Sequence, residues 1–79
     1  MKISVRLIAT FMELLPPGTK GNKIEIEVPE GTTASVVMAQ FNVPQDASSV
    51  IVVNGLTVPL STLLVEGDVV SAFSAVAGG

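Results

Sequence analysis

The 79-residue sequence predicts an α+β fold: a mixed sheet of four to five strands with one main helix packed on one face. Three observations predict it. Apolar and polar residues alternate strictly near the start of the chain and again after a loop rich in proline and glycine. A single segment in the middle has the apolar spacing of a helix, and short β-branched segments between turn residues follow it. The length fits one domain.

The first half of the chain contains two segments with the alternation of half-buried strands. Residues 2–7 alternate between apolar and polar side chains, and the same pattern returns over residues 23–28. Between them, Phe11–Leu15 can form one short helical turn, which Pro16-Pro17-Gly18 stops because proline breaks the backbone pattern. Pro29-Glu30-Gly31 ends the second strand.

The segment Ala34–Phe41 has the pattern of an amphipathic helix. Four apolar side chains share one stripe at i, i+3, i+4 and i+7, namely Ala34, Val37, Met38 and Phe41. The hydroxyl of Thr32 or Thr33 can cap the first turn, and Pro44 closes the segment. Two valines make its intrinsic helix propensity low, so we expect packing to hold it in place.

The second half predicts three further strands. Val50–Val53 is a continuous β-branched run, as expected for a strand buried on both faces. Asn54-Gly55 is a tight-turn signal, after which Leu56–Leu60 returns as a short strand. Glu66-Gly67-Asp68 forms another turn, and Val69–Phe73 is the last strand.

This order of elements predicts a β-grasp (ubiquitin-like) roll. The two terminal strands lie side by side and parallel at the centre of the sheet, and the helix crosses one face. Residues 1–73 form the β-grasp domain, and residues 74–79 form a flexible C-terminal tail that ends in Gly-Gly.

Composition excludes several classes of function. Seven acidic against four basic residues give a net charge of −3, and Trp and Tyr are absent, which argues against nucleic-acid binding. Without Cys or His the chain lacks disulfides and the usual transition-metal ligands, so we expect no metal and no bound cofactor. No apolar segment approaches the roughly 20 residues of a membrane helix. We therefore expect a soluble cytoplasmic protein, without catalytic machinery of its own, that docks on other proteins.

The Gly78-Gly79 end is the candidate reactive site. A carboxylate behind two residues without side chains can enter a narrow channel, because no Cβ blocks its approach. The alternative is a frayed end without a role, since chain ends are commonly disordered. Phe73 is a second candidate: if Val70 and Ala72 face the helix, its ring lies on the open sheet face as a docking anchor. Otherwise Phe73 belongs to the core.

Several short motifs, taken in order, resemble the ubiquitin-like sulfur carriers of the MoaD/ThiS family. The resemblance covers essentially the whole chain, and its motifs are Val5-Arg6-Leu7, Phe11–Leu15 with the following Pro-Pro-Gly, Val28–Thr33, Val52–Gly55, and Gly67–Val70 leading to Val76-Ala77-Gly78-Gly79.

The resemblance implies a function in which Gly79 is the reacting residue. An E1-like adenylyltransferase would adenylate its carboxylate with ATP, and a sulfur donor would convert the adenylate to a thiocarboxylate. The acceptor would be an enzyme such as the molybdopterin synthase large subunit. Gly78, Ala77, Val76 and Phe73 would contact these partners.

The sequence leaves the branch of this family open. The first strand with Phe11–Leu15 and the overall length resemble the molybdopterin synthase small subunit. Asn54-Gly55 followed by Val58-Pro59 also resembles the carrier of thiamine thiazole synthesis. Ser74-Ala75 stands where many members of the molybdopterin branch have prolines. Two further functions stay open: a protein modifier conjugated to lysines through Gly79, and a plain interaction module.

Overall fold

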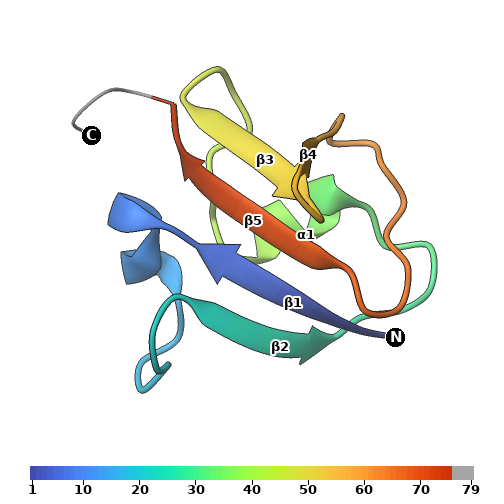
Figure 1. Cartoon of the computed structure of the whole chain (residues 1–79), viewed down its shortest axis with the longest axis horizontal. Coiled ribbons are helices and arrows are strands. Elements are labelled where there is room, and N and C mark those ends of the chain that lie inside the picture. Colours follow the sequence, from blue (N-terminus) through green and yellow to red (C-terminus); the bar gives the residue numbers. More distant parts are fainter. Residues whose placement is uncertain (76–79) are drawn as a thin grey trace.

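Residues 1–75, which the computed structural model describes, form one five-stranded mixed sheet with a single α-helix on one face (Figure 1). The strand order in the sheet is β2-β1-β5-β3-β4. In chain order the elements are β1 (Lys2–Leu7), the 3-10 helix η1 (Ala9–Leu14), β2 (Lys23–Glu27), α1 (Ala34–Gln40), β3 (Ser49–Val53), β4 (Leu56–Thr57) and β5 (Val69–Ser74). The predicted β-grasp architecture is confirmed.

The two terminal strands occupy the centre of the sheet, as the sequence predicted. β1 and β5 pair in parallel, from Ser4 opposite Val69 to Leu7 opposite Ala72. β2 pairs with β1 in antiparallel fashion at one side, and β3 pairs with β5 at the other. β5, the last strand in the chain, therefore lies between β1 and β3.

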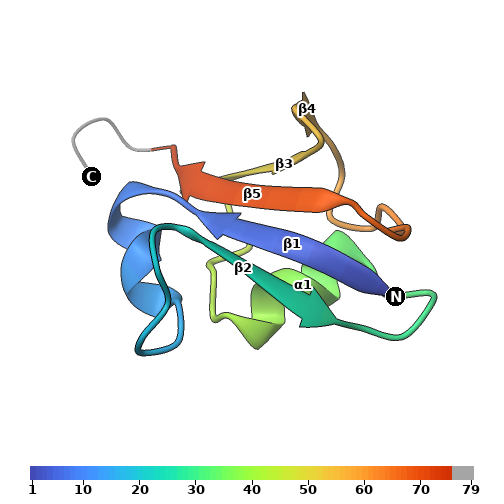
Figure 2. The same cartoon turned by 60° about the horizontal axis from the view of Figure 1, so that its bottom comes forward.

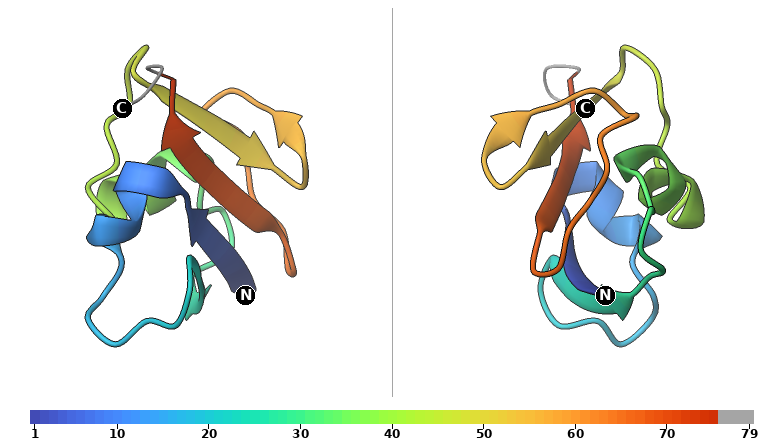
Figure 3. Two further views of the ribbon diagram at one scale, coloured as in Figure 1. Left: turned by 60° about the vertical axis from the view of Figure 1, so that its left-hand side comes forward. Right: turned by 90° about the vertical axis from the view of Figure 1, so that its right-hand side faces the viewer.

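Helix α1 packs beneath one face of the sheet and completes the core (Figures 2 and 3). All four residues of the predicted apolar stripe are buried. The helix ends at Gln40, and Phe41 follows as its C-cap. The cap at the other end is Thr33, whose Oγ1 accepts a hydrogen bond of 3.3 Å from the Val36 amide.

A distant loop also holds the first turn of α1. The amides of Ala34 and Ser35 donate to the carbonyls of Thr62 and Leu60, at 3.0 and 2.9 Å. These bonds satisfy N–H groups that have no partner within a helix. They explain how a seven-residue helix with two valines is stable here: its tertiary surroundings compensate for its weak propensity.

The prediction that β3 is buried on both faces is wrong. Ile51 and Val53 are buried against the helix layer, whereas Val50 and Val52 are only half-buried. These two valines lie on the other face, where no second layer of the described chain covers the sheet (Figure 3). The continuous apolar run of β3 therefore has one buried face and one apolar face that stays partly exposed.

Two of the short elements differ from the prediction in length or type. The returning strand β4 covers only Leu56–Thr57, because Pro59 cannot donate to a ladder and its carbonyl instead accepts from the Thr62 amide in a turn. The predicted helical turn near Phe11–Leu15 is a 3-10 helix that begins earlier, at Ala9. It contacts β1 and β5 at the end of the sheet where both strands finish.

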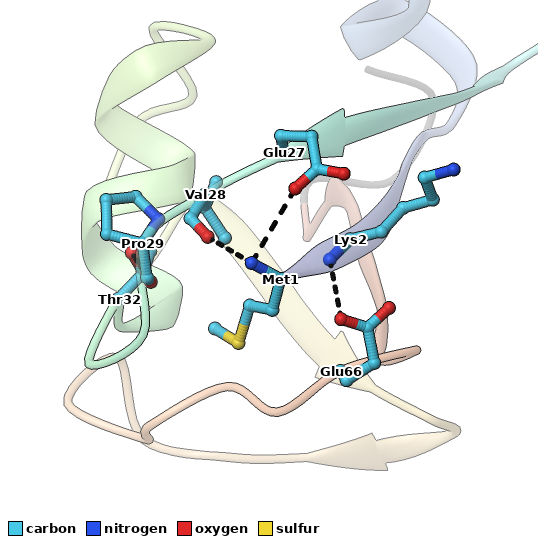
Figure 4. Close-up of polar contacts among 7 residues, drawn as sticks. All are labelled: Met1, Lys2, Glu27, Val28, Pro29, Thr32 and Glu66. Atoms are coloured by element: carbon cyan, nitrogen blue, oxygen red, sulfur yellow. Dashed lines mark hydrogen bonds and ion pairs between the residues drawn. The ribbon is translucent and has the colours of Figure 1, made fainter.

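The opposite end of the sheet is secured by polar contacts around the start of β1 (Figure 4). The Met1 nitrogen donates to the Val28 carbonyl at 2.7 Å and lies 3.6 Å from the Glu27 carboxylate. The Lys2 amide donates to Glu66 Oε1 at 3.0 Å. These contacts join β1 to the segment after β2 and to the turn before β5. No helix among residues 1–75 is long and apolar enough to cross a membrane.

Candidate docking face and base of the tail

The side chains of β5 divide the sheet into a covered and an open face. Val70 and Ala72 are fully buried beneath the sheet. Because side chains alternate along a strand, Val69, Ser71 and Phe73 lie on the opposite, open face. All three are half-buried. The structure thus places Phe73 on the face without a helix, two residues before the end of the described chain.

Neighbouring strands add further apolar side chains to this face. Val50 is directly opposite Phe73, and Val52 is opposite Ser71. Val50, Val52, Val69 and Phe73 together form what we call the open-face patch. Their partial exposure means that each retains apolar surface that a partner can cover. Aromatic residues on such surfaces contribute disproportionately to binding free energy.

Charged side chains occupy the other half of the open face, over β1 and β2. Lys2 is opposite Glu27, whereas Arg6 is opposite Lys23. Like charges directly opposite one another are unfavourable. The Arg6–Lys23 pair lies at the end of β1 that runs beside the last residues of β5. It gives this end of an acidic protein a local positive charge near the patch.

Asp68 has a larger structural role than the turn residue that the sequence indicated. Its side chain is buried, and its two carboxylate oxygens accept from Asn54 Nδ2 at 2.8 Å and from the Val65 amide at 2.9 Å. Asn54 Oδ1 in turn accepts from the Val69 amide at 2.9 Å. These hydrogen bonds join the turn after β3 to the turn before β5. No local sequence signal shows that Asn54 and Asp68 would meet.

The last described residues continue the pairing between β5 and the segment at the start of β3. β5 pairs with β3 as far as Ser74 opposite Ser49. One residue further, the Ala75 amide donates to the Ser48 carbonyl at 2.8 Å. The predicted site residues Val76, Ala77, Gly78 and Gly79 lie outside the described residues.

Within residues 1–75 no group of three or more His, Cys, Asp or Glu side chains could hold a metal ion. The features that residues 1–75 bring together are an apolar face, a local positive charge and the base of a tail. They define the class of a small protein with the ubiquitin fold and an open apolar face.

The family comparison agrees with this class. The model of the ThiS family matches residues 5–79, so the chain belongs to the ThiS family of small ubiquitin-like sulfur carriers. The resemblance noted from the sequence motifs is thereby confirmed. No curated protein sequence gives a significant match.

Solved structures of the same fold include molybdopterin converting factor subunits and a small archaeal modifier protein. A putative molybdopterin converting factor subunit 1 from Pyrococcus furiosus is 29% identical, with a TM-score of 0.74 over 95% of this chain and 98% of that one. SAMP1 from Haloferax volcanii has a TM-score of 0.76 and 16% identity, with both chains fully covered. A chain of the complex of molybdopterin-converting factor subunits 1 and 2 from Helicobacter pylori has a TM-score of 0.64 and 21% identity, again with full coverage. The last two show the fold alone.

Proposed function

We propose that this chain carries sulfur as a thiocarboxylate on Gly79 and donates it in molybdopterin synthesis. The observation that carries the proposal is the family match, which continues from the sheet through to Gly79. The α-carboxyl group has a reference pKa of about 3.5, so it is ionised at neutral pH and can react without a base from the carrier.

The proposed cycle has three steps. The Gly79 carboxylate attacks the α-phosphorus of ATP on an E1-like adenylyltransferase, and pyrophosphate leaves. Hydrosulfide from a sulfur donor then attacks the acyl carbon, and AMP leaves to give the thiocarboxylate. The loaded carrier finally docks on an acceptor enzyme, its sulfur bonds to the acceptor, and water hydrolyses the acyl–sulfur bond, which leaves the sulfur on the acceptor and restores the carboxylate. In this scheme the carrier itself holds no cofactor, ATP is used by the partner, and the reactions take place in the cytoplasm.

The open-face patch supports the docking part of the cycle. It lies on β3 and β5, so a partner that covers Phe73 and Val50 is close to Ala75, the last described residue before the segment that ends in Gly79. The similarity to the Pyrococcus furiosus protein favours the molybdopterin branch, with a synthase large subunit as acceptor. Because the matching family is the ThiS family, thiamine thiazole synthesis is the second candidate pathway.

The test is enzymatic loading followed by intact-mass measurement. The chain is incubated with the cognate E1-like enzyme, ATP and a sulfur source, and we expect the mass change of one oxygen replaced by sulfur. A variant extended by one residue after Gly79 should fold normally and remain unloaded. An unmodified wild-type chain, with an enzyme shown to be active on another carrier, would refute the proposal.

The same preparation distinguishes the pathways. Loaded carrier is offered separately to a molybdopterin synthase large subunit with its pterin precursor and to a thiazole synthase. Sulfur transfer only to the thiazole synthase would contradict the molybdopterin branch while leaving the carrier function intact. Higher-mass lysine conjugates through Gly79 in cells would instead indicate a protein modifier.

A further inference from the structure

The loop between α1 and β3 forms hydrogen bonds both with the helix and with Ala75, the last described residue. Gln45 fixes the start of this loop to α1: its Oε1 accepts from Ser35 Oγ at 2.6 Å, and its Nε2 donates to the Ser35 carbonyl at 3.1 Å. The residue after Gln45 is Asp46, so the carboxylate of Asp46 starts from a position anchored on the helix.

Asp46 organises the rest of the loop through one carboxylate oxygen. Its Oδ1 accepts from the Ser48 amide at 2.8 Å and from Ser48 Oγ at 2.5 Å. The Asp46 carbonyl also accepts from the Ser49 amide at 3.1 Å. Ser48 therefore bonds to the Asp46 carboxylate through both its amide and its hydroxyl.

The carbonyl of Ser48 is the acceptor for the Ala75 amide at 2.8 Å. In a regular antiparallel ladder, two opposite residues of this kind exchange two hydrogen bonds. Here the Ser48 amide donates to Asp46 instead, so a single hydrogen bond joins Ser48 and Ala75. This single bond extends the pairing of β5 one residue beyond Ser74. Through Ser48, this bond is linked to the Asp46 carboxylate.

We propose that Asp46 is a positioning residue for the reactive tail, acting through Ser48 on Ala75. This inference rests on the proposed function of Gly79. Anchoring Ala75 leaves four residues beyond it, which span at most about 14 Å when extended. Loss of the anchor frees further backbone that must be ordered again when the tail enters the channel of the activating enzyme, and each ordered residue carries an entropic cost.

The cost of ordering falls on binding and not on the chemical step. We therefore expect Asp46→Ala to raise the KM of the activating enzyme for the carrier about fivefold, with kcat unchanged. Asp46→Asn retains an acceptor oxygen for Ser48 and should restore most of the wild-type KM. Glu30→Ala removes one carboxylate from another exposed loop and is the matched control for net charge.

Amide hydrogen exchange at Ala75 supplies a readout that is independent of the enzyme. Asp46→Ala should accelerate exchange at Ala75 severalfold and leave the amides of the central strands protected. Asp46→Asn should fall between Asp46→Ala and the wild type, and Glu30→Ala should match the wild type.

Each result decides the inference. Faster Ala75 exchange together with a raised KM and a constant kcat supports it. If the wild-type chain is loaded but Asp46→Ala leaves the exchange rate of Ala75 or the KM unchanged, the positioning role of Asp46 is overturned and the proposed function is not. A wild-type chain that is not loaded overturns the proposed function, and the positioning role with it, whatever the exchange rates.

Discussion

Asn54 and Asp68, fourteen positions apart, join the two turns at one end of the sheet by a hydrogen bond of 2.8 Å from Nδ2 to Oδ1. Asn54 is exposed and has a φ of 52°, and Gly55 follows with 86°, as a tight hairpin turn requires. Asp68 is buried. The bond fixes the turn after β3 against the start of β5, so it sets the position of the strand that leads to the tail.

Asn54→Gly should destabilise the protein by about 1–3 kcal/mol, because Asp68 and the Val69 amide each lose a partner. Glycine keeps the positive φ, so backbone strain does not contribute. Asn42→Gly is the control: Asn42 is also exposed, with a φ of 60°, and within residues 1–75 its side chain makes no hydrogen bond. Urea unfolding of both variants measures the difference, and equal stabilities would contradict the proposed role of the bond.

The Asp46 carboxyl should titrate below its ordinary pKa of 3.8. The hydrogen bond from the Ser48 hydroxyl lowers this pKa most and the Ser48 amide adds to the effect, while partial desolvation opposes both. Ser48→Ala should therefore raise the pKa of Asp46 toward 3.8, which side-chain carboxyl NMR during an acid titration can follow. An unchanged pKa in Ser48→Ala would show that the hydroxyl bond does not form in solution.

The same shift has a defined sign in the stability of the protein. The pKa of Asp46 is lower in the folded than in the unfolded state, so its contribution is present above about 3.8 and is lost as pH falls through the lowered value. The side chain is exposed, and we expect the effect to be small. The difference in stability between wild type and Ser48→Ala that comes from this shift should therefore be present above about pH 3.8 and disappear as the pH falls through the lowered pKa of Asp46.

Val37→Ala should cost about 2–3 kcal/mol of unfolding free energy, because Val37 is fully buried and its removal leaves a cavity beneath the sheet. The neighbouring Val36 is 55% exposed, and Val36→Ala should be neutral or slightly stabilising, since alanine is the better helix former. Urea denaturation of this adjacent pair tests the orientation of α1. A larger loss for Val36→Ala would mean that the helix presents a different face to the core.

Phe73→Ala should weaken binding to the activating or acceptor enzyme about 30-fold if Phe73 anchors the docking face. Leu56→Ala, at a 69% exposed position on β4, should bind like the wild type. Isothermal titration with each partner measures both, and thermal unfolding confirms that the variants are folded. Unchanged affinity for Phe73→Ala would assign the ring to the structure of the sheet alone.

The order and type of the main elements could be read from local patterns. Alternation over residues 2–7 and 23–28 predicted β1 and β2, and the stripe from Ala34 to Phe41 predicted both α1 and its buried face. β-branched residues placed β3 correctly but overstated its burial. The spacing of apolar residues along a strand shows which of its faces are apolar, but it does not show whether another layer of the protein covers them.

The sequence by itself determined the fold class, the family and the residue proposed to react, because apolar periodicity, turn residues and family motifs are contained in short stretches of chain. The tertiary structure decided which apolar face stays open, that Asp68 is buried against Asn54, and that Asp46 reaches the base of the tail through Ser48. These relationships join residues that are distant in the chain. They depend on strand order and register, which are set when the whole sheet pairs and packs on α1.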